Sequence, residues 1–392
     1  MKCVPGRHEM IIRSNSLYIP LKNESVHCVI TSPPYWGLRN YQVNGQLGLE
    51  KTPEEYVQNM VMVGREIWRV LCDDGTLWLN MGDSYWGGGG GNYGNPIAAQ
   101  HGQHLTNVKN KYCPDGLKPK DLCGIPWRLA FALQAEGWYL RSDIVWSKLN
   151  PMPESVTDRP TKSHEYIFLL SKSPHYFFDQ EAVREPDKGT DHWRGVIDGQ
   201  KSLEPSGGLK GPHRGIRTPH GRNGTGRNIR TVWNIATQPF SGAHFATFPE
   251  ELVRRCLFAG TSEKGCCLDC GKPWVRIKQR IDRDWDGSKY GERVVESTGG
   301  AIGGGTSRST LGSSHGKLVG SMITVGWKPS CTCNGDCPDS PVPCIVFDPF
   351  FGAGTVGVVA QKYNRRFVGL ELKPEYCQMA QNRVNSQPVA MI

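Results

Sequence analysis

The feature that most restricts the fold of this chain is a glycine turn close to its C-terminal end. The stretch VFDPFFGAGTVGVVA, Val346 to Ala360, reads as a buried strand, a turn and the start of a helix. Its Gly352, Gly354 and Gly357 have the spacing G-x-G-x-x-G, which lets a backbone approach a nucleotide cofactor closely. Such a turn usually opens a nucleotide-binding domain, but little of the 392-residue chain follows it. The other strands of that domain therefore have to be sought before the turn.

Composition indicates a soluble chain with a basic surface. Hydrophobic residues make up 38% of the sequence, the mean hydropathy is −0.46, and no apolar run reaches the roughly eighteen residues of a membrane span. The first residues lack the apolar core of a signal peptide, so we expect a cytoplasmic protein in a prokaryotic cell or encoded by a phage. In that compartment the 14 cysteines should be thiols or metal ligands. The net charge of +9 fits a polyanionic partner or a merely basic surface equally well.

An α/β pattern stands at both ends of the chain, with irregular sequence between. Apolar periodicity and turn residues predict strands and helices in alternation. The predicted strands are 25–30, 75–80, 138–146, 344–348 and 365–372, with a hairpin of two strands around Lys172 to Pro174, and the predicted helices are 54–71, 125–136 and 355–363.

An acidic residue supports a nucleotide cofactor at the glycine turn. Glu371 ends the strand FVGLEL, where a carboxylate can accept hydrogen bonds from ribose hydroxyls. The turn and this acid suit NAD as well as an adenosyl cofactor, and a purely structural glycine turn also remains open.

The string TSPPYW, Thr31 to Trp36, distinguishes these possibilities. It directly follows a predicted strand, so it lies at a carboxyl edge, where open α/β sheets bind ligands. Two consecutive prolines fix the backbone and remove two N–H donors, which leaves the carbonyls of Ser32, Pro33 and Pro34 as rigid acceptors. Such acceptors beside Tyr35 suit an exocyclic amine on a flat base, with the ring stacked on that base. The alternative is a simple Pro-Pro turn at the end of a strand.

Together, TSPPYW and DPFFGAG resemble the motifs of the amino-methylating DNA methyltransferases. That family carries a (D/N/S)-P-P-(Y/F/W) catalytic motif, here Ser32-Pro33-Pro34-Tyr35, and an F-x-G-x-G motif for S-adenosylmethionine. The order of the two motifs resembles the permuted beta group. The resemblance implies an α/β Rossmann-like methyltransferase fold, with a mixed, mostly parallel sheet and helices on both faces. It also implies a circularly permuted motif order with irregular target-recognition and zinc-ribbon-like inserts.

The resemblance divides the chain into five segments. They are 1–187, the N-terminal catalytic half; 188–231, a basic loop for target recognition; 232–262, a return to the core; 263–343, a Cys-rich, zinc-ribbon-like insert with a Gly/Ser loop; and 344–392, the cofactor-binding half.

The same resemblance indicates the residues that hold S-adenosylmethionine. They are Asn15, His244, Asp348, Phe350, Gly352, Gly354, Thr355 and Glu371. Two positions depart from the family pattern. Asn15 stands where an Asp commonly faces the adenine, and Phe351 stands where a small residue is common, so Phe351 is expected to reshape the loop.

The expected reaction is methyl transfer to an exocyclic amine of a base flipped out of duplex DNA. In the family, Ser before Pro-Pro favours the N4 amine of cytosine and Asp favours the N6 amine of adenine, so Ser32 favours N4. N6-adenine methylation, RNA as the substrate, NAD-dependent oxidoreduction and an inactive zinc-containing nucleic-acid-binding protein remain alternatives. A restriction endonuclease is a possible partner, and the oligomeric state is open.

Two close cysteine pairs suggest a structural zinc site. Cys267 and Cys270 form a C-x2-C knuckle, and Cys331 and Cys333 form a C-x-C pair after a long loop. Because C-x-C is tighter than usual, Cys337 or Cys344 could replace one ligand, with Cys266 as a further candidate. Free thiols are the alternative.

A segment rich in glycine, proline and basic residues is expected to contact double-stranded DNA. Its candidate contacts are Lys210, Arg214, Arg217, Arg222, Arg227 and Arg230. A solvated flexible insert is the alternative.

Overall fold

A computed structural model describes most of the chain as two compact units. The described residues are 9–86, 116–186, 226–238, 248–283, 290–292, 321–333 and 340–387. The first unit comprises Met1–Asp179, Arg230–Trp274 and Pro329–Ile392, and the second comprises Gln180–Ile229 and Val275–Lys328.

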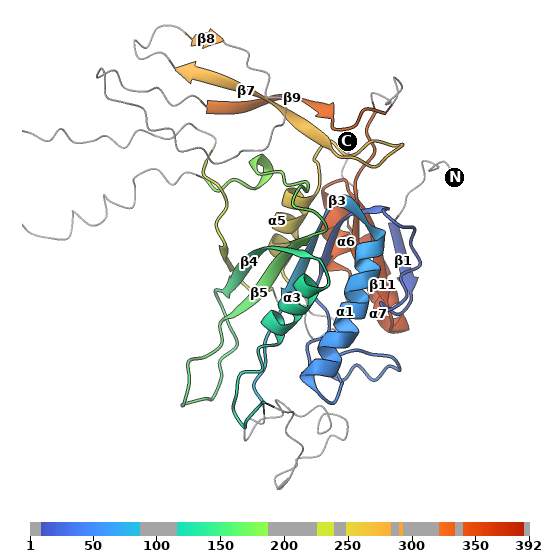
Figure 1. Ribbon diagram of the computed structural model, residues 1–392, viewed down its shortest axis with the longest axis vertical. Helices are drawn as coiled ribbons and strands as arrows, with labels where there is room; N and C mark the ends of the chain where they lie inside the picture. The colour runs from blue at the N-terminus through green and yellow to red at the C-terminus, as the bar shows by residue number, and fades with distance from the viewer. Residues whose placement is uncertain are drawn as a thin grey trace, which may run out of the picture. The chain divides into compact units, whose positions relative to one another are not determined.

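The first unit is built around an eight-stranded sheet with the order β1-β11-β10-β2-β3-β5-β4-β6 (Figure 1). Neighbouring strands are parallel from β1 to β3, β5 runs antiparallel to both β3 and β4, and β6 is parallel to β4. The strands are β1 (Glu9–Arg13), β2 (Val26–Thr31), β3 (Leu71–Met81), β4 (Tyr139–Lys148), β5 (His164–Ser171), β6 (Val232–Ile235), β10 (Ile345–Asp348) and β11 (Arg366–Glu371).

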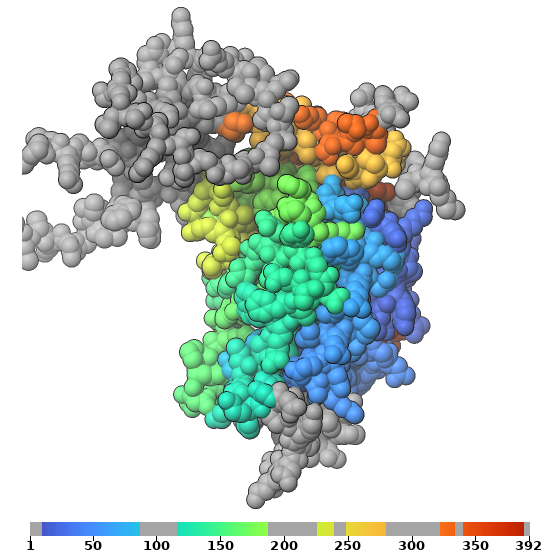
Figure 2. All heavy atoms as spheres, viewed as in Figure 1, coloured from blue at the N-terminus to red at the C-terminus, as the bar shows by residue number. Residues whose placement is uncertain are grey.

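Helices cover both faces of this sheet (Figure 1). Helices α1 (Pro53–Val70) and α3 (Ile125–Ala135) pack together on one face, where Figure 2 shows their side chains as one continuous surface. Helices α5 (Glu250–Gly260), α6 (Thr355–Lys362) and α7 (Pro374–Asn385) cover the other face. The mixed, mostly parallel sheet and its two helical layers confirm the predicted fold class.

Local sequence explains why α1 begins where it does. Thr52 caps the helix, because its hydroxyl oxygen accepts a hydrogen bond from the Glu55 N–H at 3.1 Å. Pro53 occupies the first turn, where its missing N–H costs no hydrogen bond, and two glutamates follow. The buried face of α1 packs Tyr56 and Ile67, among others, against the core.

The two ends of the chain meet in the middle of the sheet. β10 lies between β11 and β2, with Val346 opposite Cys28 and Phe347 opposite Val29. The strand before the glycine turn is therefore hydrogen-bonded to the strand before TSPPYW. The N-terminal part of the chain thus supplies the strands that the glycine turn lacks.

The second unit contains a three-stranded sheet with the order β8-β7-β9, formed by β7 (Trp274–Arg283), β8 (Tyr290–Glu292) and β9 (Ser321–Pro329). A 3-10 turn at Glu181–Val183 is tied to β7, because Glu181 accepts hydrogen bonds from Arg184 at 2.6 Å and from Lys278 at 3.1 Å. The division differs from the five predicted segments. Among the described residues, the predicted Cys-rich segment falls in both units, and its four paired cysteines belong to the first.

The predicted hairpin around Lys172 to Pro174 is wrong. β5 ends at Ser171, and the residues after it form bends instead of a second strand. The Phe178 ring stacks on Trp78 with centroids 6.4 Å apart, so this aromatic stretch covers the sheet face.

Among the described residues, no helix is long and apolar enough to cross a bilayer.

Candidate active site

A buried hydrogen bond joins the two predicted motifs. Thr31 ends β2 and Asp348 ends β10, and the Thr31 hydroxyl donates to Asp348 Oδ1 at 2.7 Å. Both side chains are almost fully buried. Because these parallel neighbours end at the same edge, Ser32 and the glycine loop start side by side. This edge is the place where open α/β sheets bind ligands.

Hydrogen bonds from backbone N–H groups to two carboxylates shape the loop after β10. The Phe350 N–H donates to Asp348 at 3.0 Å, and the Gly352 N–H donates to Glu371 at 2.9 Å. Gly352 and Gly354 have φ of 50° and 77°, in the left-handed region that favours glycine. Gly354 then caps the N-terminus of α6. The two glycines thus set a tight turn at a helix N-terminus, where a ligand can approach the backbone.

Phe351 does not lie on the ligand side of this loop. Its ring is buried and stacks on Phe367 with centroids 5.6 Å apart. A Cβ on Gly369 would overlap the Phe351 ring, and a Cβ on Gly357 would lie 2.7 Å from it. The third glycine of the motif and Gly369 therefore make room for Phe351 beneath the loop. This departure from the family pattern is accommodated inside the core.

Two carboxylates at this edge lie in surroundings that oppose their negative charge. Burial raises the pKa of Asp348 to about 7, although the bonds from Thr31 and Phe350 act in the other direction. Burial also raises the pKa of Glu371. A positively charged ligand would stabilise both ionised forms. S-adenosylmethionine carries such charge, so this edge fits it.

Replacing Asp348 with Asn should stabilise the fold at neutral and alkaline pH. The folded pKa of Asp348 is about 7 against 3.8 for a free side chain, so the wild type loses stability as the pH rises through this window. Asn keeps the same acceptor oxygen without the charge, and the gain in unfolding free energy should be on the order of 3 kcal/mol above about pH 8. Urea unfolding at about pH 5 and about pH 8 measures it.

The comparison between the two pH values is the control for Asp348→Asn. At the lower pH the wild-type carboxyl is mostly protonated, so the difference between the proteins should shrink. A variant that is less stable than the wild type at alkaline pH would show that the buried charge is already compensated. Calorimetry should show weaker binding of S-adenosylmethionine, because the charge that attracts it is gone.

The acceptor cluster of the SPPY motif is smaller than the sequence predicted. The Pro34 carbonyl is already occupied, since the buried Tyr56 hydroxyl of α1 donates to it at 2.8 Å. The expectation that this carbonyl is free for a ligand is therefore wrong. No described residue donates to the Pro33 carbonyl. Ser32 and Pro33 remain as the acceptors at the sheet edge.

The Tyr35 hydroxyl belongs to a compact polar network. It donates to Glu165 Oε2 at 2.6 Å, it accepts from Asn80 Nδ2 at 2.8 Å, and it lies 3.3 Å from Ser32 Oγ. Asn80 Nδ2 is also 2.9 Å from Glu165 and 3.3 Å from Ser32. Lys148 binds the other oxygen of Glu165 at 2.6 Å. Burial first, and then the nearby Glu165 charge, raise the pKa of Tyr35 well above its usual value.

Two neighbours fix the ring of Tyr35 and the residue after it. Gly82 follows β3 beneath the ring, where an added Cβ would lie 2.6 Å from Tyr35 Cε2. Trp36 is buried, donates to the Glu50 carbonyl at 3.0 Å and stacks on Trp86. Trp36 therefore packs beneath the motif and supports it.

The remaining predicted cofactor residues take different positions. Asn15 follows β1, where its side chain accepts from the Leu17 N–H at 3.0 Å and donates to the Gly45 carbonyl at 3.3 Å. Thr355 begins α6, and its hydroxyl accepts from Arg383 of α7 at 2.9 Å. Phe350 is half-buried against the core. His244 lies outside the described residues.

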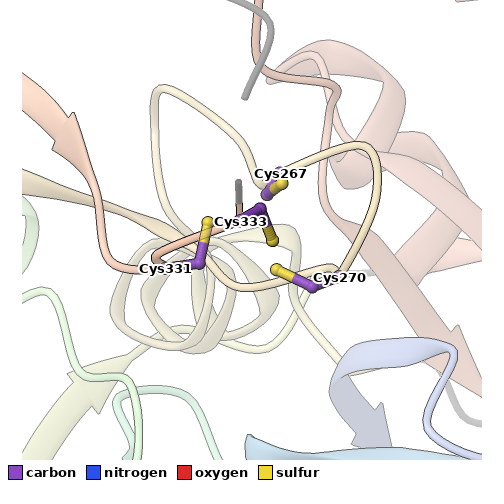
Figure 3. Close-up of side chains that lie close together, drawn as sticks. All are labelled: Cys267, Cys270, Cys331 and Cys333. Carbon is purple, nitrogen blue, oxygen red and sulfur yellow. The ribbon is translucent and has the colours of Figure 1, made fainter. Parts of the chain in front are cut away.

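Four cysteines converge on one point in the first unit (Figure 3). The sulfur atoms of Cys267, Cys270, Cys331 and Cys333 all lie within 4.8 Å of one another. They come from two loops that the sequence separates widely. Four convergent thiols are the donor set of a tetrahedral structural zinc site.

The knuckle that carries two of these cysteines is anchored to the central sheet. The Gly271 N–H donates to the Cys267 carbonyl at 3.0 Å, and Gly271 has a φ of 74°. His27 of β2 binds the Gly271 carbonyl through Nε2 at 2.9 Å. The Ile345 N–H donates to His27 Nδ1 at 3.0 Å, so Nε2 carries the hydrogen. The site is thereby tied to β10, which leads into the glycine loop.

Of the spare cysteines, Cys266 and Cys344 do not join this cluster. Cys266 is buried and its thiol donates to the Val342 carbonyl at 3.4 Å. Cys344 is also buried, with its sulfur 4.0 Å from the Ser262 carbonyl. Cys337 lies outside the described residues.

Only two of the six candidate DNA-contact residues fall in the described part of the chain. Arg227 forms an ion pair with Glu185 at 2.8 Å. The carbonyl of Arg230 accepts from the Trp233 indole at 2.8 Å. The remaining four, Lys210, Arg214, Arg217 and Arg222, lie outside the described residues.

Sequence reasoning missed three polar residues around Tyr35. Asn80 lies near the end of a predicted strand, so the rule that ligands bind at carboxyl edges could have identified it. Lys148 ends β4, but its position depends on how β4 pairs with β5. Glu165 lies near the start of an antiparallel strand, and no local signal marks it.

The chain is similar to known DNA methyltransferases. A family described as DNA methylase matches residues 26–270 and 341–382. Type II methyltransferase M.Cfr9I of Citrobacter freundii is 40% identical over 372 residues, which cover 95% of this chain and 85% of that protein. Type II methyltransferase M.XycI of Xanthomonas campestris pv. cyanopsidis is 39% identical, covering 94% of this chain and 84% of that protein. The structure of the PvuII DNA methyltransferase, cytosine-N4-specific, has a TM-score of 0.50 at 14% identity, covering 97% of this chain and 88% of that one, and supports the fold alone.

Proposed function

Because the chain belongs to the N6/N4 family of DNA methylases, we propose that it methylates the N4 amine of cytosine in duplex DNA at the edge formed by its two motifs. The observation that carries this proposal is the hydrogen bond between Thr31 and Asp348. It places the acceptors of the SPPY motif beside the glycine loop. A methyl donor held at the loop and an amine held at Ser32 would therefore be neighbours.

The residues that would hold S-adenosylmethionine follow from the loop geometry. Gly352 and Gly354 would allow the close approach, and Glu371, which lies beside this turn, would accept hydrogen bonds from ribose hydroxyls. Asp348 offers negative charge to a cationic ligand. When bound, S-adenosylmethionine supplies a methyl group attached to a positively charged sulfur.

Ser32 and Pro33 would prepare the target amine. The nitrogen lone pair of a base amine is delocalised into the ring, so the amine is a poor nucleophile. Hydrogen bonds from the amine to Ser32 Oγ and to the Pro33 carbonyl would favour the tetrahedral nitrogen that reacts. Alignment of the two reactants would supply much of the remaining acceleration.

Tyr35 would receive the base after it leaves the duplex. An amine inside a stacked duplex cannot reach a pocket at a sheet edge, so the base should be flipped. The Tyr35 ring rests on Gly82 and would replace part of the lost stacking. We assign the phosphate contacts to the basic segment, with Lys210 and the arginines named above as candidates.

Ser32 supports cytosine N4 as the target, because serine before Pro-Pro accompanies this specificity in the family. The test is to incubate the protein with varied duplex DNA and S-adenosylmethionine labelled in its methyl group, and then to identify the labelled nucleoside by mass spectrometry. N4-methylcytosine is expected. N6-methyladenine would keep the mechanism and overturn the base assignment, and an absence of label would favour an inactive nucleic-acid-binding protein.

A structural zinc ion is the second part of this proposal. The four convergent thiols support it, and the link through His27 would make the ion stabilise the strand that carries the glycine loop. The ion would hold the fold together and take no part in methyl transfer.

The variant Cys267→Ser should weaken zinc binding. Elemental analysis of the wild type should find about one zinc per chain, and the variant should retain much less, with a lower melting temperature. Cys72→Ser is the matched control, because Cys72 lies outside the cluster and serine can keep its 3.3 Å hydrogen bond to the Glu24 carbonyl. Wild-type protein that contains no metal after growth with added zinc would contradict the site.

The Type II names of the two relatives support a role in modification. We propose that this chain protects its recognition sequence from a restriction endonuclease, which would be its functional partner. Its substrate would then be chromosomal DNA in the cytoplasm of a prokaryotic cell.

A further inference from the structure

The half-buried ion pair between Glu165 and Lys148 has no role in the mechanism described so far. The side chain of Glu165 is 13% exposed and that of Lys148 is 23% exposed. Burying two charges costs desolvation energy that their attraction often fails to recover, so such a pair is a weak means of stabilising a fold. Both oxygens of Glu165 are engaged, one by Lys148 and one by the network around Tyr35. This position points to an effect on the catalytic motif.

The carboxylate decides the direction in which hydroxyl protons point. An ionised carboxylate can only accept hydrogen bonds, so the single proton of the Tyr35 hydroxyl must be donated to Glu165. The Tyr35 oxygen is then an acceptor toward Ser32, 3.3 Å away. The Ser32 proton can therefore be directed to Tyr35. A lone pair of Ser32 is left for the substrate amine.

Asn80 supports the same arrangement. Its Nδ2 is within hydrogen-bond distance of oxygen atoms of Glu165, Tyr35 and Ser32. The NH₂ group is a donor, so it faces these oxygens, and the amide oxygen points away from them. Its Oδ1 is buried without a partner among the described residues. The NH₂ end of the amide thus faces the Glu165 carboxylate, while the amide oxygen is left without a hydrogen bond from any described residue.

We propose that the Glu165–Lys148 pair is a positioning device. It makes the hydroxyl hydrogen of Tyr35 point to Glu165 and that of Ser32 point to Tyr35, so that Ser32 meets the target amine as an acceptor. This inference rests on the proposed function, because only an amine substrate requires an acceptor at Ser32. A neutral acid at position 165 could donate to Tyr35. The Tyr35 proton would then turn to Ser32, and the Ser32 proton would face the amine hydrogens.

The charges around Glu165 keep it ionised. Burial alone would raise the pKa of Glu165, but the Lys148 ammonium, with hydrogen bonds from Lys148, Tyr35 and Asn80, holds it below the usual range. Two further basic groups lie close in sequence, Lys162 and His164, and both interact electrostatically with Glu165. Asp83 faces Lys162, and Tyr56 lies near Tyr35. Lys148 is the only one of these charges that contacts the carboxylate among the described residues.

The test compares the pH dependence of single-turnover methyl transfer in the wild type and four variants at saturating DNA and S-adenosylmethionine. Because the pKa of Glu165 is held below its usual range, the wild type should keep its rate until the pH falls below that range, where protonation of Glu165 reverses the direction of these hydrogen bonds. Lys148→Met should move this acidic limb upward by about one pH unit or more. Lys148→Arg, which keeps the cation, should leave it near the wild-type position.

Glu165→Gln should lower the rate about 100-fold across the whole pH range while KM for DNA changes little. Its amide oxygen would face Lys148, so its NH₂ group would face Tyr35. The hydrogen bonds that join residue 165, Tyr35 and Ser32 would then run in the opposite direction at every pH. Glu136→Gln is the matched control. Glu136 pairs with Arg65 on the helical face at 2.8 Å, away from the network, and its variant should keep the wild-type rate and profile.

The outcomes separate this inference from the function on which it rests. A Lys148→Met profile identical to that of the wild type, or a Glu165→Gln variant with the wild-type rate, overturns the positioning role and leaves methyl transfer intact. A wild type that transfers no methyl group to DNA overturns both. If Lys148→Met does not fold, the comparison of Lys148→Arg with Glu165→Gln still decides, because a purely structural role would not remove the acidic limb.

Discussion

Replacing Tyr35 with alanine is expected to lower the rate of methyl transfer by about 1,000-fold while binding of S-adenosylmethionine changes little. The variant loses the ring that would stack on the flipped base, a contact of about 1–3 kcal/mol. It also removes the hydroxyl that links Ser32 to Glu165 and leaves that buried carboxylate with one donor fewer, which adds about 1.5–3 kcal/mol. Single-turnover assays measure the rate, and calorimetry measures the affinity for the cofactor.

Tyr35→Phe separates the two contributions. It keeps the ring above Gly82 but removes the hydroxyl, so it should retain DNA binding and show an intermediate loss of rate. Tyr35→Ala with the wild-type rate would refute the stacking role. Equal rates for Tyr35→Phe and the wild type would show that the hydroxyl network is dispensable for transfer.

Replacing Gly352 with valine is expected to reduce the affinity for S-adenosylmethionine at least about 100-fold. The φ of 50° disfavours any β-branched residue, and the side chain would occupy the space that the backbone needs for close approach. The strain should also lower the unfolding free energy by about 1–3 kcal/mol. Calorimetric titration measures the affinity, and urea unfolding measures the stability.

Gly137→Val is the matched control for Gly352→Val. Gly137 has a φ of 105° beyond the end of α3, and nothing lies within 4 Å of the Cβ that a side chain would add. This variant carries comparable backbone strain far from the loop, so it should lose stability but keep its cofactor affinity. Unchanged affinity in Gly352→Val would show that the cofactor does not approach this turn.

The parts of the site that the sequence predicted carry strong local signals. The apolar strand before TSPPYW and the apolar strand before DPFFGAG are short runs that end in conspicuous turn residues. Their parallel pairing placed both motifs at one edge, as the resemblance implied. The cysteine pairs were found in the same way, because their spacing is typical of metal ligands, and the two loops bring the four sulfur atoms together.

The missed parts depend on tertiary pairing. Glu165 reaches Tyr35 only because β5 is inserted antiparallel between β3 and β4. No periodicity in the sequence specifies that insertion. The Pro34 carbonyl was expected to be free on the evidence of the two prolines alone. Tyr56, which donates to it, is 22 positions away in the sequence, on a helix whose packing onto the motif could not be predicted.

Phe351 illustrates how a departure from a family pattern can be compensated elsewhere. The sequence suggested that a large residue at this position would reshape the loop. The structure places the ring under the loop instead, in space left by Gly357 and Gly369. The compensating Gly369 lies in a different strand, so a motif read in isolation could not reveal it.

Under the proposed function, the two ends of the chain form one site for the methyl donor and the target amine. A crystal structure of the complex with S-adenosylhomocysteine would test this arrangement directly. The ligand is expected at the Gly352 loop, with its ribose hydroxyls on Glu371 and its sulfur facing Ser32 and Pro33. A ligand bound elsewhere, or one whose sulfur faces away from the SPPY motif, would show that the two motifs do not form one site.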